Sequence, residues 1–351
     1  MMKKTLLATA IAATMVASGA QAATVYDQDG TKLDIYGRIA MGVAGGGPEY
    51  NSADEKIDNG AEFVDVFSRL GLRMSHEVTS DLTAFGRLEW RFKGDERSGE
   101  SVNGVDAFSE IRQSYIGLRS NSWGTIQGGN FDSFYNQAVS APFDVYIDRG
   151  LEFAGHPTQS RGDSVGYITP NLSGFQVYLQ GKHYSTRGEV EPTDGSTVAG
   201  QGGAVYEINN LRLAAGFVDD VVEGGGNDEM LYGATVSYEF VPGFSGRLGY
   251  ETQDDSSTHG GGHDTWGVGM SYSSGPWAVN ADIYDVDPEG GDSRTSWALG
   301  GYYNLTSSFQ TFVELQQADQ QAINVTIDGL DSDVEADGDD MYYLVGARYF
   351  F

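Results

Sequence analysis

The sequence predicts an all-β fold: a 16-stranded antiparallel up-and-down transmembrane β-barrel with a long loop folded into the lumen. The first observation is the C-terminal segment Met341–Phe351, in which every second residue is apolar or aromatic. A period of two places one face of a strand against an apolar environment and the other against water. At about 3.3 Å per residue and a tilt of roughly 40°, the segment rises about 28 Å, close to the apolar band of an outer-membrane barrel, about 25 Å tall.

The second observation is an export signal. Two lysines precede the apolar run Leu6–Val16, which is too short to span a bilayer, and Ala20-Gln21-Ala22 provides a small-x-small cleavage site. We therefore expect residues 1–22 to be a secretory signal peptide and residues 23–351 to be the mature β-barrel domain. An N-terminal membrane anchor is the alternative, but the apolar run is short for that role.

The composition excludes several classes of protein. The chain has no cysteine, so no disulfide stabilises it, and its 49 glycines, 20 tyrosines, 17 phenylalanines and 5 tryptophans suit twisted strands with aromatic girdles. Beyond the N-terminus no stretch approaches 18 consecutive apolar residues, and the mean hydropathy is −0.34, so no membrane-spanning helix is expected. A formal net charge of −29 argues against nucleic acid as a partner.

The third observation is a regular alternation of strand-like segments with turns. Seven short connections, rich in Asn, Gly, Pro, Ser or Asp, alternate with eight longer loops. This pattern predicts an even number of strands with both termini at the short-turn end. Two soluble β-sandwiches are the alternative, but they leave apolar rows such as Trp266/Val268/Met270/Tyr272 in need of partners. The predicted strands are 32–43, 63–77, 82–93, 109–120, 124–130, 163–170, 174–184, 202–209, 211–220, 229–241, 244–254, 264–273, 277–286, 295–305, 309–318 and 341–351.

One connection, residues 131–162, is expected to narrow the lumen. Sixteen strands enclose a water-filled interior, and a loop of about thirty residues inside a compact domain is usually functional. Its apolar side chains require a wall to pack against, and inside a barrel that wall is the lumen. We therefore predict that 131–162 is a constriction loop. Its apolar residues are Phe134, Tyr135, Phe143, Tyr146, Ile147, Leu151 and Phe153.

Strand parity assigns several charged side chains to the inner face. In Leu33–Ile39 the apolar residues face outward, so the residues between them point inward. The same reasoning applies to the second and third predicted strands. Parity is less clear in the fourth strand, which carries Arg112, and Arg161 lies where the long loop rejoins the wall. The inward set predicted from parity is Asp34, Tyr36, Arg38, Arg69, Arg73, Phe85, Arg87, Glu89 and Arg91.

The long loop supplies opposite charge through Asp144, Asp148 and Glu152. Arginines on neighbouring wall strands repel one another unless they are balanced or hydrated. Facing rows of opposite charge would place a transverse field across the constriction. Such a field favours polar solutes that align with it over apolar solutes that must displace oriented water. The arrangement is a filter without a bond-making step, so no enzymatic activity is expected.

These residues stand in segments that resemble the general trimeric porins of Gram-negative outer membranes. The similarity covers essentially the whole mature sequence. It is carried by Leu33-Asp34-Ile35-Tyr36-Gly37-Arg38, Ser68-Arg69-Leu70-Gly71, Arg112-Gln113-Ser114-Tyr115-Ile116-Gly117-Leu118, Leu151-Glu152-Phe153-Ala154-Gly155 and Tyr349-Phe350-Phe351. Two departures are Leu151, where the family has proline, and Ala154, where it has glycine, and both bear on the loop tip and the pore width.

The resemblance implies roles for individual residues. The basic cluster of the constriction would be Arg38, Arg69, Arg112 and Arg161, faced by the acids Asp148 and Glu152, and Glu89 would be a further acid of the pore wall. The loop charges add Asp144 to the acids, and strand parity adds Arg87 and Arg91 to the pore wall. Tyr349 and Phe351 would serve as the assembly signal. The resemblance also implies a homotrimer, in which the loop 94–108 latches onto a neighbouring subunit, embedded in outer-membrane lipid and lipopolysaccharide.

The leading hypothesis is a passive, cation-preferring channel for ions and small hydrophilic solutes, without a cofactor. A substrate-specific channel is the first alternative, and an outer-membrane enzyme and a structural barrel are others. Asp333-x-Glu335-x-Asp337-Gly338 begins like a calcium loop, but Leu344 stands where that loop requires glutamate. His259 and His263 lie in a glycine-rich stretch without a helix to place them together, so no metal site is expected.

Overall fold

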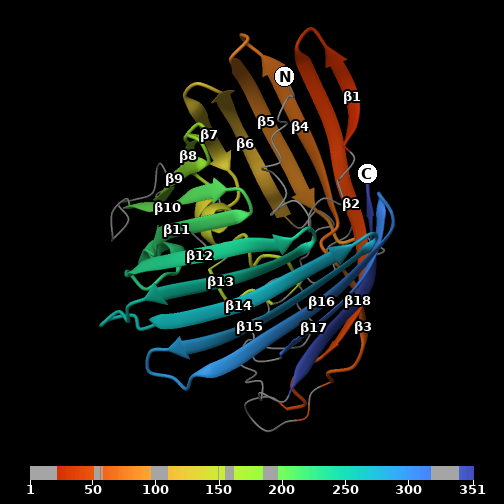
Figure 1. Cartoon of the computed structure of the whole chain (residues 1–351), viewed down its shortest axis with the longest axis vertical. Helices are drawn as coiled ribbons and strands as arrows, with labels where there is room; N and C mark the ends of the chain where they lie inside the picture. The colour runs from red at the N-terminus through yellow and green to blue at the C-terminus, as the bar shows by residue number, and fades with distance from the viewer. Residues whose placement is uncertain are drawn as a thin grey trace, which may run out of the picture.

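The computed structural model describes residues 22–50, 56, 58–95, 110–148, 150–154, 162–184, 197–317 and 340–351. The strands form one antiparallel sheet that closes into a barrel (Figure 1). Among these residues no helix is long and apolar enough to cross a membrane. The strands are β1 (Ala23–Gln28), β2 (Thr31–Gly46), β3 (Glu62–Asp65), β4 (Arg69–Glu77), β5 (Leu82–Arg91), β6 (Glu110–Ser120), β7 (Gly124–Asn130), β8 (Ser164–Ile168), β9 (Phe175–Tyr184), β10 (Thr197–Ile208), β11 (Leu211–Asp219), β12 (Met230–Val241), β13 (Phe244–Gln253), β14 (His263–Ser274), β15 (Trp277–Pro288), β16 (Arg294–Thr306), β17 (Phe309–Gln317) and β18 (Met341–Phe350), with a π-helical turn η1 (Asn136–Ser140) and a 3-10 turn η3 (Val222–Gly224).

The barrel closes where β18 pairs with β2. Val345 lies opposite Val43, and Gly37 N donates to Phe351 O at 2.8 Å. A Cβ at Gly37 would lie 2.6 Å from the Phe351 ring, so the chain approaches closely there only because the residue is glycine. β1 forms a hairpin with β2 and adds no strand to the wall. β3 and β4 pair with successive parts of β2 and together count as one wall strand. The eighteen described strands therefore form a closed wall of sixteen. This confirms the predicted 16-stranded antiparallel β-barrel.

The strand β1 was not predicted. It pairs with β2 through a two-residue turn, Asp29-Gly30, in which both residues have positive φ, 50° and 72°. Asp-Gly is a strong signal for a hairpin because both central residues of a type I′ turn need positive φ. The information was therefore present in the sequence.

The predicted strand 63–77 is interrupted at Val66, Phe67 and Ser68. Phe67 has φ of 63°, and the Arg91 guanidinium lies 4.5 Å from its ring centroid. Val64 and Val66 are both buried and belong to an interior cluster. If the alternation of β4, in which Arg69 faces inward, continued back to residue 66, Val66 would face outward. The interruption therefore changes the parity of the chain between β3 and β4.

The wall is apolar outside and polar inside. On β14 the side chain of Val268 is 51% exposed, and Trp266, Met270 and Tyr272 on the same face are exposed as well, as the parity argument predicted. Thr265, on the opposite face, is fully buried. A soluble protein has the reverse arrangement, whereas a barrel in a bilayer requires an apolar outer band.

Candidate functional site in the barrel lumen

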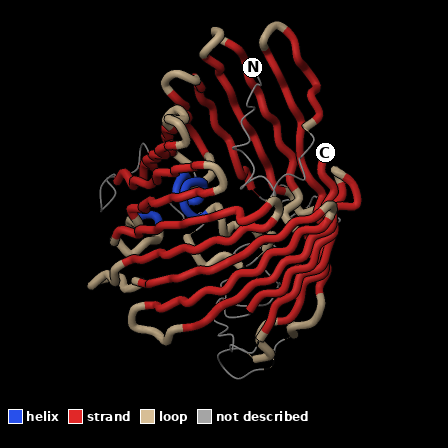
Figure 2. Tube along the Cα trace, viewed as in Figure 1, coloured by secondary structure: helices blue, strands red, loops and turns tan. Residues whose placement is uncertain are grey.

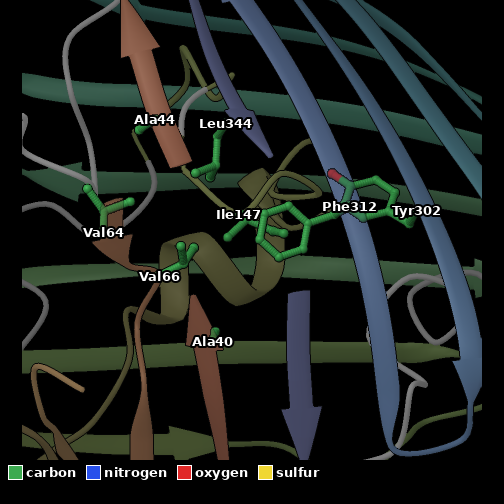
Figure 3. Packing of buried hydrophobic residues seen from close by; sticks show 8 residues of the cluster. All are labelled: Ala40, Ala44, Val64, Val66, Ile147, Tyr302, Phe312 and Leu344. Carbon is green, nitrogen blue, oxygen red and sulfur yellow. The ribbon is translucent and has the colours of Figure 1, made fainter. Parts of the chain in front are cut away.

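The segment that follows β7 lies against the inner face of the wall, as Figure 2 shows for its short helix. Its apolar side chains fill three clusters with inward-facing wall residues. Ile147 packs among side chains of β2, β3, β16, β17 and β18 (Figure 3). Tyr135, Ala138 and Val139 pack against β10, β11 and β12, and Phe143 and Phe153 pack against Tyr284 and Val286 of β15. Burying each large side chain stabilises the segment by about 1.5–3 kcal/mol.

Three wall carboxylates hold the same segment through hydrogen bonds. Glu314 on β17 accepts from Ile147 N at 2.7 Å and from Asp148 N at 3.1 Å. Glu251 on β13 accepts from Tyr135 Oη at 2.7 Å and from the backbone nitrogen of Ala154 at 2.9 Å. Asp282 on β15 accepts from Tyr146 Oη at 2.7 Å and forms an ion pair with Arg247.

Sequence reasoning missed these three anchors. Asp282 lies between Ala281 and Ile283, and Glu314 lies between Val313 and Leu315. An acid flanked by two apolar residues in a strand faces away from the apolar side, so parity alone would have assigned both carboxylates to the lumen. Their partner could not be inferred, because the contacts join residues more than 130 positions apart.

On the opposite part of the wall, Glu89 of β5 is fully buried among three arginines. Its Oε1 accepts from Arg112 Nη1 at 2.5 Å and from Arg69 Nη1 at 3.4 Å, and its Oε2 accepts from Arg87 Nη2 at 2.9 Å. Tyr36 Oη also donates to Oε2, at 2.7 Å. The strands β4, β5 and β6 therefore bring Arg69, Arg87, Arg112 and Glu89 together, with Tyr36 of β2 beside them.

The other predicted arginines border this cluster. Arg38 Nε donates to the carbonyl oxygen of Phe67 at 3.0 Å, and the Arg73 guanidinium lies 4.1 Å from the Tyr36 ring centroid. Arg91 Nη1 lies 3.4 Å from a carboxylate oxygen of Glu110. Arg161 lies outside the described residues.

The acids of the inserted segment have different environments. Glu152 forms two hydrogen bonds with Arg294 of β16, at 2.9 and 2.6 Å. Asp148 is only 6% exposed, beside Glu314, whereas Asp144 is exposed and accepts from Asn136 Nδ2 at 3.3 Å. Asp144 is therefore the most accessible acid of the three.

The remaining predicted sites are partly described. Tyr349 is exposed on the outer face, and Phe351 forms backbone hydrogen bonds with Gly37 at the barrel closure. Of the loop 94–108 only Gly94 and Asp95 are described, and Asp95 Oδ2 accepts from Asp65 N at 2.9 Å within the same chain. The acidic segment 328–339, with its calcium-like spacing, and the signal-peptide residues 1–21 lie outside the described part of the chain.

The sequence of this lumen-bearing barrel matches a known family model, described as Gram-negative porin, over residues 8–323. The chain belongs to the Gram-negative porin family. This porin is 28% identical to a monosaccharide porin of Halomonas sp, over 91% of this chain and 96% of that protein. It is 25% identical to outer membrane protein F of Serratia marcescens, over 100% of this chain and 89% of that protein.

A solved structure shares the fold of this porin. The anion-selective porin from Comamonas acidovorans superposes with a TM-score of 0.73 at 19% identity, covering 92% of this chain and 100% of that chain. The family resides in the outer membrane of Gram-negative bacteria and consists of passive channels rather than enzymes. The predicted family, location and non-enzymatic character are therefore confirmed.

Proposed function

We propose that this porin is a passive channel through which ions and small hydrophilic solutes diffuse, filtered at the level of the inserted segment. The observation that carries the proposal is the segment itself: its apolar side chains and backbone amides are fixed to the inner face of the closed wall, mainly to β10–β18. A barrel of sixteen strands has an aqueous interior, and a segment on one side of that interior narrows the passage.

A transverse field at the narrowed level is the second part of the proposal. The arginines gather on β2, β4, β5 and β6, whereas the inserted segment is fixed mainly to strands from β10 onward. Glu89 carries one negative charge against Arg69, Arg87 and Arg112, so this wall keeps positive charge. Asp144 presents negative charge from the segment. A polar solute can exchange water contacts for contacts with both sides.

Cation preference completes the proposal. The chain carries a formal charge of −29, which raises the concentration of cations near the channel. Within the lumen, Arg294 balances Glu152 and Asp144 is exposed, so we assign most of the local contribution to Asp144 and little to Glu152. This revises the relative weight of the three acids that the sequence suggested.

We also propose that the mature protein, after removal of residues 1–22, is a homotrimer in contact with lipid and lipopolysaccharide. An apolar depression of about 700 Å³ on the barrel surface supports a subunit contact across β4–β8, since Met74, Ile116, Ile126 and Val165 line it. Ile116 is 74% exposed, which is unusual for isoleucine unless lipid or protein covers it. Tyr349 and Phe351 remain the proposed assembly signal.

The reversal potential across a planar bilayer under a KCl gradient tests the filter. We expect cation selectivity in the wild type and a clear reduction in Asp144→Asn/Asp148→Asn. The matched control is Glu152→Gln/Arg294→Gln, which removes one charge of each sign and should leave the reversal potential within a few millivolts. Unchanged selectivity in the first variant, or a larger change in the control, would show that these acids do not set the preference.

A further inference from the structure

A second feature of the lumen is a polar cavity of about 660 Å³ beside the start of the inserted segment. Gln113, Tyr115, Arg119, Gln127 and Tyr178 line it from β6, β7 and β9, and Asp132 lines it from the segment. The turn residues Asn121 and Asn171 also line it, so it lies toward the short-turn end of the barrel, which is the periplasmic end in this architecture. It is distinct from the anchors on β13, β15 and β17.

The cavity is rich in carboxamides and phenols. Gln113 is 2% exposed; its Nε2 donates to Asp132, while its Oε1 accepts no hydrogen bond from any residue that the structure describes. Gln127, Gln137 and Gln176 add three more carboxamides to the lining. The Gln113 oxygen is itself enclosed, so the carboxamides of Gln127, Gln137 and Gln176 are the groups that can meet a hydroxyl in the cavity.

Aromatic rings shape the wall of the cavity. The Tyr115 ring packs edge-on against Phe131 with centroids 5.9 Å apart, and the Tyr178 ring packs edge-on against Phe134 at 5.8 Å. These contacts fix the rings and leave both phenols as lining groups of the cavity. Rigid aromatic side chains next to carboxamides offer apolar faces for C–H groups and polar groups for hydroxyls.

The two cations in the lining have different surroundings. Arg87 shares Glu89 with Arg69 and Arg112 and lies 2.9 Å from it, and Asp132 lies 3.5 Å from Arg112. Arg119 is exposed, its guanidinium lies 4.9 Å from the Phe85 ring centroid, and it forms no salt bridge within the described ranges. A guanidinium held over a ring presents a planar pair of donors, which matches a carboxylate.

We propose that this cavity is a low-affinity binding site for a hydroxylated monocarboxylate of monosaccharide size, that is, a sugar acid. The volume fits a small ligand, the carboxamides and phenols match hydroxyl groups, and Arg119 matches a single carboxylate. A phosphate dianion would favour a second cation without a carboxylate partner, whereas the other cation of the described lining, Arg87, contacts Glu89 at 2.9 Å. The inference rests on the proposed channel function and specifies a solute class that the channel binds on its path.

The test is a single-channel recording in a planar bilayer with sodium D-glucuronate added on the short-turn side. We expect brief, saturable reductions of the current at millimolar glucuronate, at least tenfold weaker effects with D-glucose and weaker effects with glucose 6-phosphate. Arg119→Gln should weaken the effect at least tenfold, and Arg119→Lys should weaken it less. Arg73→Gln, an inner-wall arginine outside the cavity, is the matched control and should leave the effect unchanged.

The outcomes separate this inference from the channel function. Gln127→Glu places a negative charge in the lining and should abolish the glucuronate effect while the channel still conducts, which gives a second variant if Arg119→Gln does not assemble. Normal conductance without any glucuronate effect would overturn the binding site and leave the channel intact. Equal effects in wild type and Arg119→Gln, or stronger effects of glucose 6-phosphate, would also overturn it. Absence of conductance in the wild type would instead refute the channel.

Discussion

The buried ion cluster on β5 gives the sharpest prediction of stability. Glu89 accepts hydrogen bonds from Arg69, Arg87, Arg112 and Tyr36 at 2.5–3.4 Å, and its side chain is fully buried. In Glu89→Gln, the three guanidiniums would keep their positions but lose the shared negative charge. Breaking a buried charge cluster by removing one partner costs about 3–5 kcal/mol. Because the arginine side chains are 12–26% exposed, water relieves part of this penalty, and we expect a loss of about 3 kcal/mol.

Urea unfolding of the refolded barrel in lipid vesicles measures this loss. The matched control is Glu110→Gln, since Glu110 pairs with Arg91 at 3.4 Å and is 34% exposed, and an exposed pair contributes no more than about 1 kcal/mol. Glu89→Gln should also shift the reversal potential toward anions, because the lumen gains one positive charge. A loss below about 1 kcal/mol for Glu89→Gln, equal to the control, would refute the reasoning that the cluster depends on this carboxylate.

Three further predictions address the wall, the inserted segment and a turn. Val268→Arg places a charge on the outer apolar band and should lower the unfolding free energy in vesicles by about 2–4 kcal/mol, falling to about 1 or less if the site lies near the interface. Glu251→Gln weakens the hydrogen bond that Tyr135 Oη donates at 2.7 Å. This change should lower the unfolding free energy by about 1.5–3 kcal/mol and increase single-channel current noise. Unchanged noise would show that this anchor is dispensable. The hydrogen bond from Ser120 Oγ, at 2.6 Å, lowers the pKa of Asp81 below 3.8, so this stabilisation is present above about pH 4 and is lost as the pH falls through the lowered value. Asp81→Asn should therefore unfold at lower urea than wild type near pH 6, and the difference should shrink as the pH falls through the lowered pKa of Asp81; a constant difference from neutral to acidic pH would contradict the assignment.

The sequence predicted the parts of this barrel that depend on local periodicity. The segment Met341–Phe351 and the outer row that includes Val268 follow a period of two, because each strand has one face against an apolar phase and one against water. The hairpin at Asp29-Gly30 also has a local signal, because Asp-Gly favours the two positive φ values of its turn. The break at Phe67 carried none, since a bulky residue rarely adopts a positive φ.

The candidate site was predictable only in part, for a physical reason. Parity placed Arg69 and Glu89 on the inner face, and the structure brings them together because their strands are adjacent. The partner of Glu152 is Arg294, 142 positions away, and the barrel must close before these residues meet. A local sequence pattern cannot predict a pair so far apart in the chain. The different environments of Asp144, Asp148 and Glu152 are therefore known only from the structure.

Solute flux into liposomes tests the central claim, passive diffusion through an aqueous channel, most directly. Proteoliposomes should swell in neutral sugars at rates that rise linearly with concentration and fall steeply as solute size increases, with empty liposomes as the control. Rates indistinguishable from empty liposomes, or saturation in neutral sugars at low concentration, would contradict a passive, water-filled channel.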